Sequence, residues 1–192
     1  MRTVLSLALA ALPAAALAFD QVRIADPAAL QGVRQVYVAE VALDLPEPTH
    51  RFALRSGEPR PVRPQDAATQ AAALGAALQR GLGRDFELVA APGPGVLVVR
   101  PTLDGLASSR PTFADFDRQP GLSFRSFYAG GASLRLQLER DGRPVAEISD
   151  RYTGSLADGM PRVGVWQDTD RAFSRWARQL PEVVRQPTLA AR

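Results

Sequence analysis

The sequence predicts an α+β fold: a single domain in which two helices pack on one face of a mostly antiparallel sheet. Two observations lead to this prediction. Five short segments carry the alternating or continuous apolar patterns of strands, and two longer segments carry an apolar stripe at helical spacing. Their order is β-α-β-β-β-β-α, and a run of strands between two helices is typical of α+β domains.

The first 18 residues have the pattern of an export signal. Arg2 supplies a positive charge, residues 4–12 are apolar, and residues 16–18 (Ala-Leu-Ala) form a small-x-small cleavage pattern. The apolar run is too short to span a bilayer. We therefore expect cleavage before Phe19 and a soluble protein that is periplasmic or secreted.

The rest of the chain divides into a lead-in, a domain and a tail. A polar lead-in is expected over 19–33, one domain over 34–185, and a flexible tail over 186–192. The domain begins with a predicted strand over 35–45, where apolar side chains recur with a period of two. Residues 46–64 contain five prolines and the single histidine, a composition that predicts a loop.

A helix and two strands are predicted next. Residues 66–82 carry an alanine-rich apolar stripe and are followed by glycine, which suits a helix that lies close against a sheet. Residues 86–90 alternate as a short strand, and a Pro-Gly-Pro-Gly turn follows. Residues 96–103 form an apolar strand, in which Pro101 lacks a ladder donor and therefore predicts an edge or a bulge.

A β-hairpin is predicted by the strands 133–139 and 143–152. A two-residue Asp-Gly turn would place Leu136 opposite Glu147 and so mix the two faces of the sheet. A three-residue loop with its glycine in the left-handed conformation would place Leu136 opposite Ala146. The apolar pattern favours the three-residue loop.

The last helix is predicted to begin at Asp168, whose carboxylate suits a helix N-cap. Pro181 should kink or end this helix. Its buried stripe is formed by Phe173, Trp176, Ala177, Leu180 and Val184.

Composition excludes several kinds of chemistry. The chain has no cysteine and one histidine, which excludes thiolate nucleophiles, cysteine zinc sites and histidine metal clusters. All 23 basic residues are arginine, so a Schiff-base lysine and a P-loop lysine are excluded as well. The formal net charge is only +3 and the arginines are spread among acids, so no nucleic-acid partner is predicted. No catalytic, cofactor or metal site is predicted.

Two groups of polar residues could carry chemistry, and each has a plainer interpretation. His50 is either a general base or an exposed loop histidine. Asp104, Asp115 and Asp117 form either an acid pair or ordinary solvated and capping carboxylates. No serine or carboxylate stands at a telling spacing from His50, and aspartates this close in a loop are usually solvated or capping. The plainer interpretation is therefore favoured for both groups.

Two pairs of glycines resemble phosphate-binding motifs only superficially. Gly93 and Gly95 lie in a proline-rich turn that no helix follows, so they do not form a dinucleotide fingerprint. Gly130 and Gly131 precede a strand rather than a helix. We expect them to ease a bulge or a close approach of two backbones.

Residues 107–130 resist assignment and hold five of the chain's aromatic residues. This segment could cover a bare face of the sheet, could bind a partner or ligand with Arg110 as one polar anchor, or could be disordered. The candidate partner-binding residues are Phe113, Phe116, Arg118, Phe124, Arg125, Phe127 and Tyr128.

Short motifs occur in order along the chain: Tyr37-Val38, residues 85–89, residues 92–97, residues 130–133, Asp150-Arg151, Gly154, Asp170, Phe173 and Trp176-Ala177. Over residues 34–185 they resemble the uncharacterised bacterial family called domain of unknown function thirty-three thirteen. The resemblance implies a small envelope protein, and many members of the family are lipoproteins. It implies no catalytic residue, because the family has no established activity. The absence of a lipobox cysteine favours a soluble form in this chain.

The sequence thus favours an exported, non-catalytic periplasmic protein that binds a partner or accessory component of the cell envelope. Two alternatives remain open. One is a periplasmic hydrolase that uses aspartate and serine groups. The other is a small-ligand binder in which the 107–130 loop acts as a lid.

Overall fold

The structure is a computed structural model that describes residues 19–46, 62–119, 121–123, 125–158 and 163–187. The predicted leader, His50 and Phe124 lie outside the described residues, as does most of the predicted 46–64 loop.

Three long strands form the centre of the fold. β5 (Leu97–Ala107), β6 (Gly131–Arg140) and β7 (Arg143–Thr153) pair antiparallel in chain order. Within the described residues they belong to one seven-stranded sheet with the order β1-β7-β6-β5-β2-β4, and β3 pairs with β5 beside that path.

Four short strands complete the sheet. β1 (Gln21–Ile24) pairs antiparallel with β7 at one edge. β2 (Gln35–Val38) and β3 (Ala42–Leu43) run parallel to β5, and β4 (Glu87–Leu88) runs parallel to β2. The sheet is therefore mixed, although its longest ladders are antiparallel.

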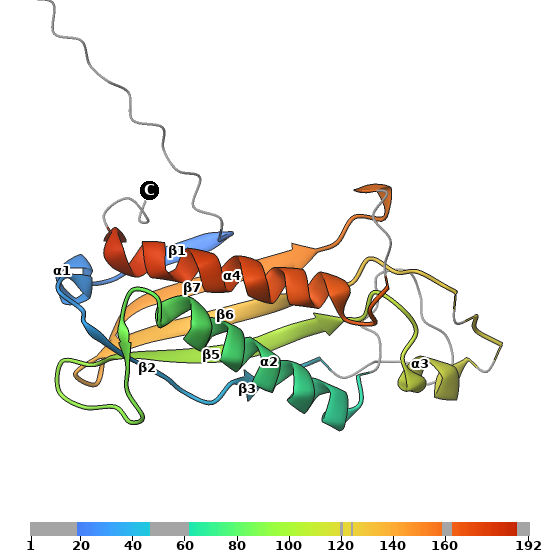
Figure 1. Ribbon diagram of the computed structural model, residues 1–192, viewed down its shortest axis with the longest axis horizontal. Helices are drawn as coiled ribbons and strands as arrows, with labels where there is room; N and C mark the ends of the chain where they lie inside the picture. The colour runs from blue at the N-terminus through green and yellow to red at the C-terminus, as the bar shows by residue number, and fades with distance from the viewer. Residues whose placement is uncertain (1–18, 47–61, 120, 124, 159–162, 188–192) are drawn as a thin grey trace, which may run out of the picture.

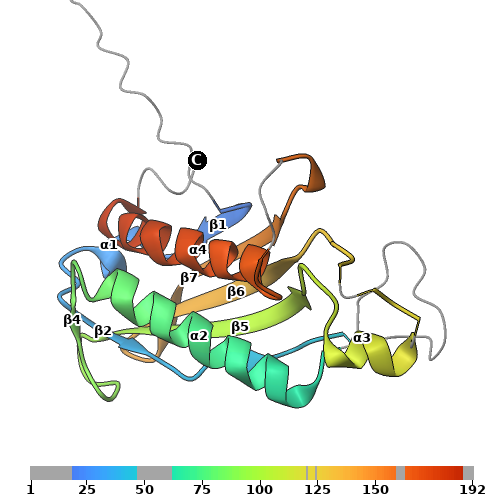
Figure 2. The same cartoon turned by 45° about the vertical axis from the view of Figure 1, so that its right-hand side comes forward.

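Two long helices, α2 (Pro64–Leu82) and α4 (Gln167–Arg185), lie side by side on one face of the sheet (Figure 1, Figure 2). No helix of the described residues covers the other face, which we call the open face. The predicted α+β class and single domain are confirmed. The shorter helices are α1 (Pro27–Leu30), α3 (Phe113–Arg118) and the 3-10 turn Leu156–Asp158.

The core lies between these two helices and the sheet. The stripe predicted for the last helix is buried, and Trp176 and Leu180 have no exposed surface. The sheet side of the core is formed mainly by Val36, Leu97, Val99, Leu103, Leu134, Leu136, Leu138 and Ile148. Burial of this apolar surface is the main force that holds the two layers together.

The predicted first strand is interrupted, and the interruption explains Pro101. β2 ends at Val38 and the chain pairs with β5 again only at β3. The carbonyls of Val99 and Leu103 accept hydrogen bonds from the Ala39 and Asp44 amides at 2.9 and 3.0 Å. The backbone groups of the odd-numbered residues in this part of β5 therefore point toward β2 and β3. The nitrogen of Pro101 therefore points into the gap between β2 and β3, where no donor is needed. A register shift lies just beyond, between Leu103 and Gly105.

The prediction of a three-residue hairpin loop is wrong. Arg140 pairs with Arg143 across a two-residue turn, in which Asp141 and Gly142 have φ values of 51° and 74°. A register shift between Leu138 and Glu139 then skips one residue of β7, so that apolar residues again share a face.

The resulting register differs from the predicted one. Leu136 pairs with Ile148 rather than with Ala146. The skipped residue is Val145, whose carbonyl accepts hydrogen bonds from the Ala25 and Asp26 amides at 2.9 and 3.2 Å. The register is therefore set by the bulge as well as by the turn.

Replacing Asp141 by alanine should destabilise this hairpin. Asp141 holds a positive φ, and its Oδ1 accepts a hydrogen bond from the Gly95 amide at 2.7 Å. We expect the free energy of unfolding to fall by about 1–2 kcal/mol in urea denaturation. Asp141→Asn keeps an acceptor and tolerates this φ, so it should cost clearly less; equal losses in the two variants would contradict the explanation.

Candidate functional site

A buried polar cluster ties the start of α4 to the ends of three strands. Asp168 is fully buried, and its Oδ2 accepts hydrogen bonds from the Ser109 hydroxyl at 3.0 Å and the Gly130 amide at 3.2 Å. Its Oδ1 accepts from the Arg171 guanidinium at 3.0 Å. We call Ser109, Gly130, Asp168 and Arg171 the polar knot. The predicted N-cap role of Asp168 is wrong, because Trp166 holds that position and the carboxylate faces the strand ends.

The glycines of this region permit close backbone contacts, as the sequence predicted. A Cβ on Gly131 would lie 2.0 Å from the Tyr152 carbonyl oxygen, and one on Gly130 would lie 2.4 Å from the Ser109 hydroxyl oxygen. A Cβ on Gly154 would lie 2.3 Å from the Asp168 carboxyl carbon. These glycines therefore serve the packing around the polar knot.

A second buried carboxylate joins α4 to the edge of the sheet. Asp150, on β7, accepts a hydrogen bond from the Trp176 indole nitrogen at 2.5 Å and another from the Asp20 amide at 2.8 Å. Because each carboxylate oxygen accepts one of these hydrogen bonds, Asp150 holds both α4 and the residue that precedes β1 against β7.

These contacts leave the hydrolase alternative without support among the described residues. The Ser109 hydroxyl is buried, donates to Asp168 Oδ2 and accepts from the Asp168 amide at 3.0 Å, so its hydrogen bonds serve the fold. Asp115 is buried in a capping box with Thr112, and Asp117 pairs with Arg63 at 2.5 Å. The described residues bring together no group of three or more histidines, aspartates and glutamates that could hold a metal ion.

The unassigned segment 107–130 contains a helix, which corrects the expectation of a long loop. In α3, the Thr112 side chain accepts from the Asp115 amide, while the Asp115 carboxylate accepts from the Thr112 amide at 2.7 Å. The segment closes on itself where the Tyr128 amide donates to the Ser109 carbonyl at 3.0 Å. It extends beyond the end of the sheet rather than over the open face (Figure 1, Figure 2).

Most of the large apolar side chains that are exposed in the described residues gather at this end of the molecule. They lie on the connections 108–130 and 154–166, which leave the sheet together because Ala107, Gly131 and Thr153 pair side by side. We call this surface the aromatic end; its exposed apolar residues are Phe113 (70%), Phe127 (50%), Leu156 (60%), Val163 (79%) and Val165 (37%).

Arginines pack on both exposed rings of the aromatic end. The Arg110 guanidinium lies 5.0 Å from the Phe127 ring centroid, and the Arg63 guanidinium lies 5.5 Å from that of Phe113. Arg110 also donates to the Val163 carbonyl at 3.3 Å, which joins the two connections. Such cation–π contacts hold the rings at the surface.

Only some of the partner-binding residues predicted from the sequence are exposed at the aromatic end. Phe113, Phe127 and Arg125 are exposed, whereas Phe116, Arg118 and Tyr128 are half-buried. The sequence missed the aliphatic members of the surface, Leu156, Val163 and Val165, and the stacking arginine Arg63. No periodicity marks these residues, and only the topology places them beside segment 107–130.

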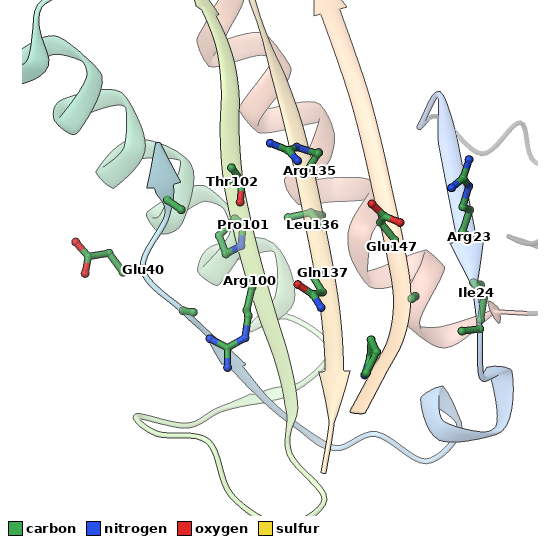
Figure 3. Close-up of a pocket in the computed structure, with 15 residues that line it drawn as sticks. Arg23, Ile24, Glu40, Arg100, Pro101, Thr102, Arg135, Leu136, Gln137 and Glu147 are labelled. Atoms are coloured by element: carbon green, nitrogen blue, oxygen red, sulfur yellow. The ribbon is translucent and has the colours of Figure 1, made fainter. Parts of the chain in front are cut away.

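The open face of the sheet carries a hollow of about 740 Å³ (Figure 3). Its charged lining residues come from four strands and from the chain between β2 and β3: Arg23, Glu40, Arg100, Arg135 and Glu147. No lining residue belongs to segment 107–130. The lid alternative therefore gains no support from this hollow.

The hollow's two central arginines are already paired. Arg135 donates to Asp104 at 2.9 Å and to Asp44 at 2.5 Å, and these carboxylates, Asp104 foremost, raise the pKa of its guanidinium. Arg100 donates to Glu139 at 2.8 Å. Pairing of this kind is typical of a solvated sheet face.

Residues 21–180 match the model of the family described as "Protein of unknown function (DUF3313)". The chain belongs to this family. The resemblance seen in the sequence motifs is thereby confirmed, and several DUF3313 motif residues in this chain, such as Gly131, Asp150, Gly154 and Trp176, maintain the fold.

Solved structures with low similarity include the PelC dodecamer from Paraburkholderia phytofirmans, with 12% identity, a TM-score of 0.44, and coverage of 83% of this chain and 97% of that chain. Protein XCC0632 from Xanthomonas campestris has 14% identity, a TM-score of 0.45, and coverage of 77% and 81%. Hypothetical protein CT253 from Chlamydia trachomatis has 14% identity, a TM-score of 0.41, and coverage of 79% and 98%. No curated protein matches this DUF3313 chain.

No helix in its described part is both long and apolar enough to cross a membrane.

Proposed function

We propose that the protein is an exported, non-catalytic docking protein of the bacterial periplasm, which binds another component of the cell envelope through its aromatic end. The observation that carries the proposal is the gathering of exposed apolar side chains at one end of the fold. Exposed apolar surface is costly in water, and exposed apolar side chains concentrated beside polar ones mark interaction sites. Arg63 and Arg110 supply such polar side chains beside the exposed rings.

Two further features support the proposal. The export-signal pattern of the first 18 residues supports a periplasmic location. The buried polar groups Asp150, Asp168 and Ser109 are used in bonds between elements, which supports a non-catalytic role. The aromatic end, by contrast, makes no contribution to the core that would explain its exposed rings.

Photocrosslinking in intact cells tests this function. A photoreactive p-benzoylphenylalanine at position 127 should give adducts with an envelope component. The same amino acid in place of Leu88 should not, because Leu88 is a comparably exposed apolar residue (42%) on β4, near the opposite end of the sheet. The adducted chain should begin at Phe19 in mass spectrometry. Adducts that are absent, or equal at the two positions, would overturn the proposal.

A further inference from the structure

The apolar side chains of the aromatic end are largely exposed, and none of them lines the hollow of the open face. Val163 is 79% exposed and Phe113 is 70% exposed, although the Val163 carbonyl accepts a hydrogen bond from Arg110 and Phe113 lies beneath the Arg63 guanidinium. A rigid protein partner would need a separate pocket for each exposed group. A fluid apolar phase accommodates such groups without matched pockets.

The aromatic end also pairs each exposed ring with a basic group. Phe127 lies beneath Arg110, and Phe113 lies beneath Arg63. At a lipid surface a ring of this kind enters the acyl region. Arg110, above Phe127, reaches the phosphates, while Arg63, above Phe113, stays paired with Asp117.

Segment 107–130, which carries both exposed rings of the aromatic end, has a positive net charge. It contains three arginines and two aspartates. Asp115 is buried in its capping box, and Asp117 pairs with Arg63. Arg125 is exposed and Arg110 is half-buried. The positive charge complements a surface of anionic headgroups.

From these observations we infer that the envelope component bound by the aromatic end is an anionic lipid bilayer surface. The protein contacts it peripherally, with exposed rings and valines inserted and arginines at the phosphates. This inference rests on the proposed docking function and names its partner.

Flotation of the purified full chain with lipid vesicles tests the inference. Vesicles of phosphatidylethanolamine and phosphatidylglycerol should carry the protein. Vesicles of phosphatidylcholine alone should bind about tenfold more weakly, because the charge attraction is lost. Phe113→Ser/Phe127→Ser should lower the partition coefficient about tenfold or more, because two rings no longer enter the bilayer.

Matched variants separate this effect from unfolding and from the leader. Leu88→Ser removes a comparably exposed apolar side chain near the opposite end and should bind as the parent protein does. All variants carry the same first 18 residues, and thermal unfolding should show the same melting temperature for each. Arg110→Gln/Arg125→Gln should lose the preference for phosphatidylglycerol.

Each outcome decides the inference. Binding that is equal in Phe113→Ser/Phe127→Ser and Leu88→Ser, or equal for both vesicle types, would overturn it. If vesicles fail to bind but position 127 still crosslinks to one envelope protein, the partner is a protein and the docking function stands. If both experiments fail, the docking function falls as well.

Discussion

Replacing Asp168 by alanine is expected to lower the free energy of unfolding by about 3–5 kcal/mol. The carboxylate is fully buried and receives hydrogen bonds from Ser109, Gly130 and Arg171. Its removal takes this acceptor from the Ser109 hydroxyl and the Gly130 amide, whose hydrogen bonds to it are buried, and breaks the ion pair with the partly exposed Arg171. Urea denaturation followed by far-UV circular dichroism measures the loss.

The control lies two residues along the same helix. Asp170 is exposed in the same first turn of α4, and Asp170→Ala should change stability by less than about 1 kcal/mol. A double-mutant cycle of Asp168→Ala with Ser109→Ala should show strong coupling, because the two side chains share one hydrogen bond. Equal losses in Asp168→Ala and Asp170→Ala would show that the polar knot does not hold the fold together.

The long elements could be predicted because their patterns reflect their own burial. The stripe over 66–82 and the strong alternation over 133–139 each contain enough buried residues to identify a helix or a strand alone. The missed elements depend on other parts of the chain. β1 has only four residues and forms because β7 offers a free edge and Asp150 binds the Asp20 amide. Local propensity cannot supply that information.

Two errors have different physical causes. The sequence does not predict α3 because residues 113–118 have no apolar stripe. The Thr112-x-x-Asp115 pattern, however, is a capping-box signal that could have indicated where this helix begins. The hairpin register could not be read from the turn, because the bulge at Val145 is stabilised by hydrogen bonds from Ala25 and Asp26, more than a hundred residues earlier in the chain.

The candidate surface was half visible in the sequence. Phe113 and Phe127 stood out as aromatic residues in a segment without periodicity, and both are exposed. Val163 and Val165 look like any loop valines. They join the aromatic end only because the Ser109 amide donates to the Val165 carbonyl at 2.7 Å and the strand ends pair side by side. A surface formed by two connections can be predicted only when the pairing of the strands that they join is known.

Replacing Gly81 by alanine is expected to cost about 3 kcal/mol of stability, because the added methyl group overpacks the contact between the two long helices. A Cβ at this position of α2 would lie 2.0 Å from the Ala177 carbonyl oxygen of α4. That oxygen belongs to helix backbone and cannot turn aside as a flexible side chain would. Leu78 and Leu82 flank the contact with no exposed surface, so α2 cannot shift without disturbing the core. Thermal and urea denaturation should both record the loss.

The same substitution six residues earlier in α2 should have the opposite sign, which isolates the contact with α4 from the helix itself. At Gly75 a Cβ would meet only Val41 Cγ2, at an ordinary 3.5 Å. Gly75→Ala should therefore stabilise the protein by about 0.5–1 kcal/mol, since alanine loses less backbone entropy than glycine in a helix. If Gly81→Ala also proves stabilising, α2 and α4 do not pack as closely as the structure places them. The described packing of these helices against each other would then be wrong.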